Sequence, residues 1–175
     1  MTSRRAAGIG AWVVRPPVLA FAATVALLAA GTAAAAVRVV YAGGSWAAVD
    51  RGSVCEAASK SLRVAARRAP QARAGFAFDR HGRRRGEFHA LLSRAPRPGA
   101  TVLLTVGNQP FLLAARGQWA WSRGAAQEAA IIAAVRSSSG MRVEARDSAG
   151  RRFVDRYLLA GAPTAIDAAA AACSL

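Results

Sequence analysis

An uncharged apolar run near the N-terminus limits most strongly what this chain can fold into. Residues 16–37 contain no charged side chain, follow an arginine-containing start and end close after Ala34-Ala35-Ala36. Positive charge, an apolar segment and a small-residue cleavage site, in this order, are typical of a secretory signal peptide. The run also reaches the ~20 residues that cross a bilayer. The sequence therefore predicts an apolar export helix that is either cleaved, after Ala36 or after Ala42, or kept as a membrane anchor.

This segment divides the chain into two parts. Residues 1–42 are predicted to be a signal peptide or signal anchor, and residues 43–175 have the length of one domain. We expect this envelope domain to be exported to the periplasm, or to face the periplasm from the inner membrane with the uncleaved segment as its membrane contact. The net charge of +15 would fit nucleic acid, an anionic membrane or an acidic polymer as partner. Export disfavours nucleic acid.

The hydrophobic pattern of residues 43–175 has a period of two over most of its length, which predicts β-strands. The period becomes helical at residues 125–136, with Ser122 as the expected cap, and again after Pro163. No parallel βαβ alternation is visible. The sequence predicts a mainly β or α+β fold, an antiparallel sandwich-like sheet with one central helix and one C-terminal helix. The expected strands are residues 46–49, 54–62, 75–78, 87–92, 101–106, 110–114, 119–121, 141–147 and 153–159.

The two cysteines of the chain, Cys55 and Cys173, lie near opposite ends of the predicted domain. An exported domain meets an oxidising compartment, in which two cysteines most often form a disulfide. Closing a loop of this length stabilises a fold by roughly 4–5 kcal/mol in the chain-entropy model. The alternative is a pair of buried thiols. A redox role is disfavoured because the sequence has neither a C-x-x-C motif nor a histidine-rich neighbourhood at either cysteine.

Few residues are suited to catalysis or metal binding. The chain has two histidines, His81 and His89, and neither has cysteine or carboxylate partners at metal-ligand spacing. The sequence contains no nucleophile elbow and no glycine-rich phosphate loop. We therefore expect no catalytic residue, no metal and no cofactor, and hence a non-enzymatic protein. The alternative is a periplasmic hydrolase whose site the sequence does not reveal, using His89 or Cys55.

The densest charge of the chain is a group of four arginines around a predicted turn: Arg80, Arg83, Arg84 and Arg85. Arginine binds oxyanions with two parallel hydrogen bonds, so this group is a candidate site for an anionic lipid or glycan of the cell envelope. The alternative is a solvated hairpin tip without a ligand.

Carboxylates near the C-terminus alternate with arginines. Glu144, Asp147 and Asp155 alternate with Arg142, Arg146, Arg152 and Arg156. On a pair of antiparallel strands, this spacing predicts cross-strand ion pairs on an exposed face of the sheet. Pairs of that kind contribute about 0–1 kcal/mol each.

The C-terminal half resembles the invasion-associated locus B family. The resemblance rests on residues 99–107 (GATVLLTVG) followed by 110–113 (PFLL), on the Ile131-Ile132 helix and on residues 157–167 (YLLAGAPTAID), and it spans roughly residues 46–174. It implies a small β-rich domain, exported by Gram-negative bacteria, without established enzymatic activity. Typical members carry further cysteines, one of them beside a glycine before the central helix, where this chain reads Gly124-Ala125-Ala126-Gln127. The resemblance therefore implies a fold and a cellular location, and it carries over no functional residue.

Overall fold

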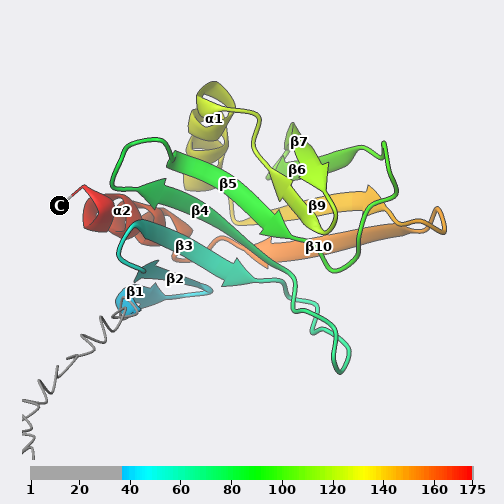
Figure 1. Cartoon of the computed structure of the whole chain (residues 1–175), viewed down its shortest axis with the longest axis horizontal. Coiled ribbons are helices and arrows are strands. Elements are labelled where there is room, and N and C mark those ends of the chain that lie inside the picture. The colour runs from blue at the N-terminus through cyan, green and yellow to red at the C-terminus, as the bar shows by residue number, and fades with distance from the viewer. Residues whose placement is uncertain (1–36, 175) are drawn as a thin grey trace, which may run out of the picture. The chain divides into compact units, whose positions relative to one another are not determined.

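The structure is a computed structural model that describes residues 37–174 (Figure 1). The predicted export helix lies outside these residues. Within them, no helix is both long enough and apolar enough to cross a membrane. The elements are β1 (Arg38–Gly43), β2 (Trp46–Asp50), β3 (Val54–Lys60), β4 (Arg73–Asp79), β5 (Arg85–Leu91), β6 (Val102–Val106), β7 (Gln109–Arg116), β8 (Trp119–Trp121), α1 (Ala125–Arg136), β9 (Gly140–Arg146), β10 (Arg152–Leu158) and α2 (Ala162–Cys173).

The strands form one antiparallel sheet with the order β1-β2-β3-β4-β5-β8-β7-β6-β9-β10. Neighbours in sequence pair with each other, except that β5 pairs with β8 and β9 pairs with β6. Most of these pairs are joined by short turns, whereas residues 61–72 form a longer connection between β3 and β4. In β3 and β9 every second side chain is buried, as expected for strands with one face on a core. The predicted mainly β, antiparallel, sandwich-like fold with a central and a C-terminal helix is confirmed.

An aromatic cluster holds the two ends of the sheet together. Trp46 on β2 packs against Phe76 on β4, with ring centroids 6.0 Å apart, and Phe76 packs edge-on against Phe88 on β5 at 5.4 Å. The indole N–H of Trp46 donates a hydrogen bond of 2.8 Å to the carbonyl oxygen of Leu158 on β10. All three rings are buried. The last strand of the sheet is thus attached to the second, and both halves of the sheet share one core.

Helix α2 lies along strands β2 and β3 (Figure 1). Its buried side chains recur at helical spacing, and most of them are alanines, which allow a close approach to the sheet. The β1–β2 turn contacts the start of this helix so closely that a Cβ on Gly44 would lie 2.2 Å from the carbonyl oxygen of Ala160. The buried face consists of Ala162, Ala165, Ile166, Ala169, Ala172 and Cys173.

Helix α1 begins differently from the sequence prediction. Its N-cap is Gly124, and no side chain caps it. The predicted cap, Ser122, bonds to strand β5 instead: its Oγ accepts the Phe88 N–H at 3.2 Å and donates to the Glu128 carboxylate at 3.0 Å. The prediction of Ser122 as the cap is wrong, because contacts with the neighbouring strand and with Glu128 use the hydroxyl.

Strand β1 is absent from the sequence prediction. Residues 38–42 follow directly on the apolar run and belong to the predicted export segment, yet Arg38–Gly43 pairs with β2 along its length. The predicted boundary after Ala42 therefore falls inside a strand. A cut after Ala36 would leave β1 whole, whereas a cut after Ala42 would remove all of it except Gly43.

Candidate functional site

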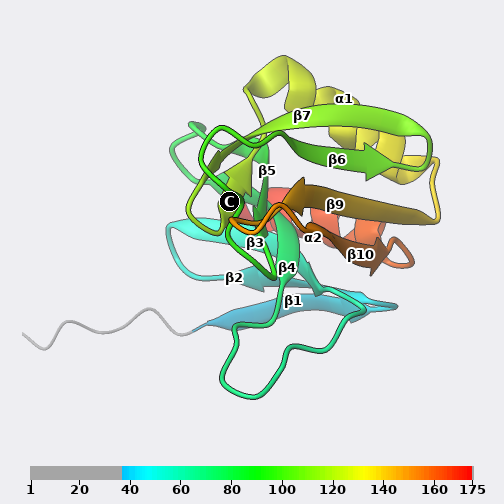
Figure 2. The same cartoon turned by 90° about the vertical axis from the view of Figure 1, so that its right-hand side faces the viewer.

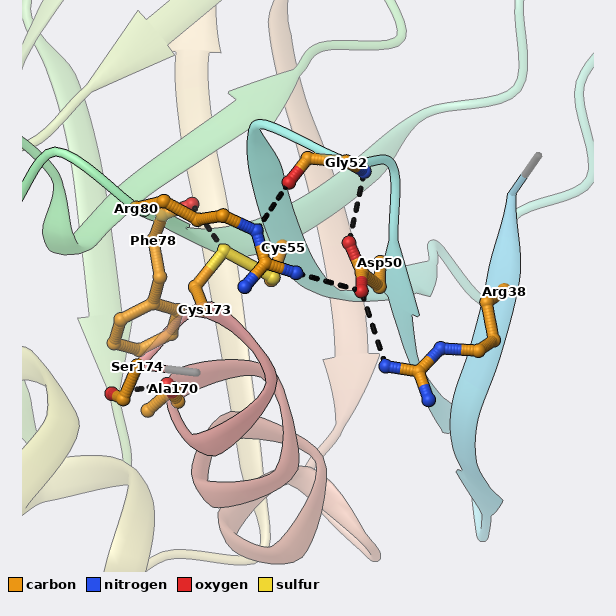
Figure 3. The surroundings of a disulfide bond; sticks show 9 residues. All are labelled: Arg38, Asp50, Gly52, Cys55, Phe78, Arg80, Ala170, Cys173 and Ser174. Atoms are coloured by element: carbon orange, nitrogen blue, oxygen red, sulfur yellow. Dashed lines mark hydrogen bonds and ion pairs between the residues drawn. A yellow bond between two sulfur atoms is a disulfide. The ribbon is translucent and has the colours of Figure 1, made fainter. Parts of the chain in front are cut away.

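A disulfide joins Cys55 on β3 to Cys173 at the end of α2 (Figure 3). The two Cα atoms are 5.7 Å apart, although 118 residues separate them in sequence. Both cysteines are buried. The predicted pairing is confirmed, and in this oxidised state Cys55 has no thiolate to act as a nucleophile. Cys173 Sγ lies 3.5 Å from the carbonyl oxygen of Phe78, so the disulfide adjoins the end of β4.

The turn that follows β4, residues 79–85, carries the four predicted anion-binding arginines and is called the arginine turn. Asp79 organises it: Oδ1 accepts the Arg83 N–H at 2.9 Å, and Oδ2 accepts the Arg84 N–H at 3.2 Å. Burial alone would raise the pKa of Asp79, but these hydrogen bonds and the charge of Arg83 outweigh it and lower that pKa. The ionised carboxylate is a structural support of the turn.

Arg80 folds back from the arginine turn onto the β2–β3 connection (Figure 3). Its Nη2 lies 3.0 Å from Asp50 Oδ2, and its Nε donates to the Gly52 carbonyl oxygen at 2.6 Å. Arg38 on β1 lies 3.2 Å from the same carboxylate oxygen. Hydrogen bonds from the Gly52 N–H and from Arg38 lower the pKa of Asp50. Arg80 therefore connects two hairpins through one carboxylate.

The remaining arginines of the turn differ in their surroundings. Arg84 lies 3.3 Å from the Glu87 carboxylate, and Arg85 Nε donates to the Gly82 carbonyl oxygen at 3.0 Å. Arg80, Arg84 and Arg85 line a cleft of about 390 Å³ beside the C-terminal end of α2, and Arg83 does not line it. The structure thus places three of the four predicted arginines at one cleft.

Much of the positive charge at this cleft is already compensated. Three of the four arginines contact a carboxylate, from Asp50, Asp79 or Glu87. Arg85 pairs with no carboxylate of residues 37–174. An anionic ligand would have to compete with these carboxylates, and the attraction that solvated arginines would supply is reduced accordingly.

His89 forms a largely buried pair with Glu56 that sequence reasoning missed. Its Nε2 lies 2.9 Å from the carboxylate of Glu56, reaching across strand β4 at Gly75. A Cβ on Gly75 would lie 3.0 Å from His89 Nε2, so this glycine leaves the space for the imidazole. The hydrogen bond from His89 lowers the pKa of Glu56 despite partial burial. The sequence signal for such a pair is a glycine on the middle strand, between a strand that carries a carboxylate and a strand that carries a histidine.

Asp155 does not lie where its alternation with arginine predicts. It is fully buried on β10, between Phe153 and Tyr157, and its Oδ2 accepts the Ser93 N–H at 2.9 Å. Asp155 Oδ1, Ser93 Oγ and the Tyr157 hydroxyl are buried without a hydrogen-bond partner among the described residues. Burial and the Asp155 charge raise the pKa of Tyr157. The expectation of an exposed ion-paired face is wrong at Asp155, because Asp155 occupies a core-facing position of its strand.

Asp147 is also buried, but it is paired. Its carboxylate lies 3.1 Å from Arg94 and 3.2 Å from Arg151. Of the three carboxylates, only Glu144 forms the predicted kind of contact, with Arg152 across the β9–β10 pair. Glu144 also lies 3.5 Å from Arg142 on its own strand. The predicted cross-strand pairing is therefore restricted to one carboxylate.

Comparison with known proteins gives no site by analogy. The chain matches no protein-family model, and no curated protein or solved structure is significantly similar to it. Among residues 37–174, no three histidine, cysteine or acidic side chains are grouped so that they could hold a metal ion. The candidate sites therefore rest on the geometry of this chain alone.

Proposed function

We propose that this chain is an exported, non-enzymatic envelope protein of the invasion-associated locus B type, which acts by binding or by structural support. It would reside in the periplasm or be tethered to the inner membrane with its domain in the periplasm. The observation that carries this proposal is the Cys55–Cys173 disulfide, because such bonds persist in oxidising compartments and are rare in the cytosol. The apolar run before residue 37 and the small β-rich fold agree with it.

Cell fractionation combined with N-terminal sequencing tests this proposal. The full chain, expressed in a Gram-negative host, is expected in the periplasmic or membrane fraction with both cysteines blocked to a thiol reagent until it is reduced. A cleaved product should begin at Val37, because a cut after Ala42 would remove nearly all of strand β1. An uncut chain in the membrane fraction would identify the segment as an anchor. A chain with reactive thiols in the cytoplasm would refute the proposal.

A second candidate function uses the cleft beside the arginine turn. Arg80, Arg84 and Arg85 line it, and Arg85 has no carboxylate partner within residues 37–174, so the cleft would bind an anionic group of an envelope lipid or glycan. Titration with a soluble phosphorylated sugar tests this role. Arg85→Ser should weaken binding several-fold, and Arg83→Ser, which removes the same charge outside the cleft, should not. Equal effects of the two substitutions would argue against a site at the cleft.

A further inference from the structure

The connection between β3 and β4, residues 61–72, projects from the sheet and is called the basic loop (Figures 1 and 2). The side chain of Gln71 fixes its base. The Gln71 amide oxygen accepts the Ala65 N–H at 2.9 Å, and its nitrogen donates to the carbonyl oxygens of Ser61 at 3.1 Å and Arg63 at 2.9 Å. The basic loop is therefore a defined structure that presents its outer residues to solvent.

The positive charge of the basic loop is not compensated. Arg63, Arg67 and Arg68 are exposed, and none of them pairs with a carboxylate of residues 37–174. The sequence contains no acidic residue between Glu56 and Asp79, so no local partner is available. Solvated guanidinium groups without partners attract an anionic surface more strongly than paired ones do.

Two aliphatic side chains are exposed beside these arginines. Val64 is 84 % exposed and Leu62 is 56 % exposed. Leaving such side chains in water forgoes the roughly 1.5–3 kcal/mol that full burial of one of them provides. The apolar part of a lipid interface would bury these two side chains, whereas a soluble polyanion would leave them in water.

We infer that the basic loop is a docking site for an anionic lipid membrane. Val64 and Leu62 enter the interface, and the arginines contact the phosphates of the headgroups. Basic residues close to an anionic leaflet add attraction, and the aliphatic side chains add apolar burial. This contact uses neither the export segment nor the arginine turn, so it stands or fails independently of the proposed function.

The space beneath the loop fits the same role. A cavity of about 330 Å³ lies between the loop and the chain that follows β5, with Arg63, Ser93 and Arg94 among its lining residues. Arg94 lies 3.1 Å from Asp147, so its charge is compensated. Arg63 is therefore the cation of this cavity that remains for the phosphate of a lipid headgroup.

Vesicle binding by loop variants tests the inference. The described residues 37–174 belong to one compact unit, so the oxidised chain 37–175 is used. It should bind vesicles of phosphatidylcholine with phosphatidylglycerol, and should not bind vesicles of phosphatidylcholine alone. The triple change Arg63→Ser, Arg67→Ser and Arg68→Ser should weaken binding about 100-fold, from about fivefold per charge. The matched control Arg97→Ser, Arg116→Ser and Arg123→Ser removes the same charge from exposed positions outside both the basic loop and the arginine turn, and should change binding much less.

The aliphatic pair needs its own variant. Leu62→Ser with Val64→Ser should weaken binding about tenfold or more, because two side chains no longer enter the interface. Leu112→Ser with Val39→Ser removes one exposed leucine and one exposed valine elsewhere, on β7 and β1, and should leave the affinity unchanged. Circular dichroism of each variant confirms that it is folded.

Penetration is measured directly with a fluorophore. In a Val64→Cys variant the added thiol is the single reactive one, because Cys55 and Cys173 are bonded to each other. An environment-sensitive dye at this position should shift to the blue with anionic vesicles, and the same dye on Leu112→Cys should not. Three results would overturn the inference: equal loss in the loop and control triple variants, an unchanged affinity of the aliphatic variant, or equal binding to a soluble polyanion such as an oligonucleotide with no shift of the dye.

Discussion

The arginine turn and the basic loop are both rich in arginine, but their surroundings are opposite. In the arginine turn, Asp79 accepts two backbone N–H groups, and Arg80 connects to Asp50 on another hairpin. In the basic loop, the guanidinium groups have no carboxylate partner within residues 37–174, and a neutral side chain, Gln71, holds the backbone. The first cluster supports the fold, and the second leaves its charge available to a partner.

This difference shows that the density of charge in a sequence is a poor guide to the charge that a surface offers. The arginine turn is denser in sequence, yet carboxylates from β2, β4 and β5 contact it. A carboxylate beside a guanidinium cancels part of its electrostatic field. The basic loop, although it has fewer arginines, therefore attracts an anion more strongly. Substitutions in each region test whether the arginine turn supports the fold while the basic loop is available to a partner.

The largest effect is expected from the disulfide, which adjoins the arginine turn. Replacing Cys55 and Cys173 by alanine should lower the free energy of unfolding by roughly 4–5 kcal/mol. Urea denaturation measures the loss, and reduction of the unmodified protein should give a similar one. Hydrogen exchange should rise at the arginine turn more than at the basic loop, because Cys173 lies against the end of β4. An equal rise in hydrogen exchange in both regions would mean that the disulfide stabilises the arginine turn and the basic loop alike.

A fall in pH should destabilise the arginine turn and leave the basic loop unaffected. The folded pKa values of Asp79 and Asp50 are lowered from their ordinary value of 3.8. Their stabilisation is therefore fully present above pH 3.8 and is lost as the pH falls through the lowered pKa values. Asp79→Asn should reduce stability at neutral pH and flatten this acid dependence, measured by urea denaturation between about pH 2 and 7. The basic loop has no carboxylate, so a Gln71→Ala variant should keep the full acid dependence, and the same flattening in that variant would contradict the assignment.

The sequence could predict most of the fold because alternation and turn residues are local signals. The strands from β2 to β10 and both helices follow from them. The disulfide joins residues 118 positions apart, and its prediction rests on expected export to an oxidising compartment. Strand β1 is not predicted, because its apolar residues continue the preceding apolar run. Only its pairing with β2 shows that these residues belong to the domain. Asp155 is misplaced because alternation with arginine does not reveal which face of a strand is buried.

The candidate sites are less predictable than the fold for a physical reason. An ion pair such as Arg80–Asp50 joins residues 30 positions apart, so no local sequence pattern predicts it. The absence of carboxylates from residues 57–78, however, is visible in the sequence. Arginines inside such a stretch lack a partner nearby in the chain, so this local signal distinguishes the basic loop from the arginine turn.

A single arginine from each region gives a smaller, matched comparison. Arg80→Ser should lower the melting temperature by about 3–6 °C, because it removes the bonds to Asp50 and to the Gly52 carbonyl oxygen. Arg67→Ser removes the same charge from the basic loop and should change the melting temperature by about 1 °C at most. Differential scanning calorimetry compares the two variants. Equal shifts would show that net charge, and not pairing, sets the difference between the regions.

The smallest effect concerns the backbone of the basic loop. Arg68 has a φ of 69°, and it is the only non-glycine residue with a positive φ among residues 37–174. A side chain in this conformation costs about 1–2 kcal/mol, and glycine would avoid that cost at a smaller entropic penalty. Arg68→Gly should therefore stabilise the domain by about 0.5 kcal/mol, whereas Arg67→Gly, with the same loss of charge, should destabilise it by about 0.5–1 kcal/mol. If Arg68→Gly also weakens binding to anionic vesicles, then the loop keeps an arginine at a position where glycine would be more stable, as expected of a residue that serves binding. If it stabilises the domain without changing vesicle binding, the charge at this position belongs to neither the fold nor the docking surface.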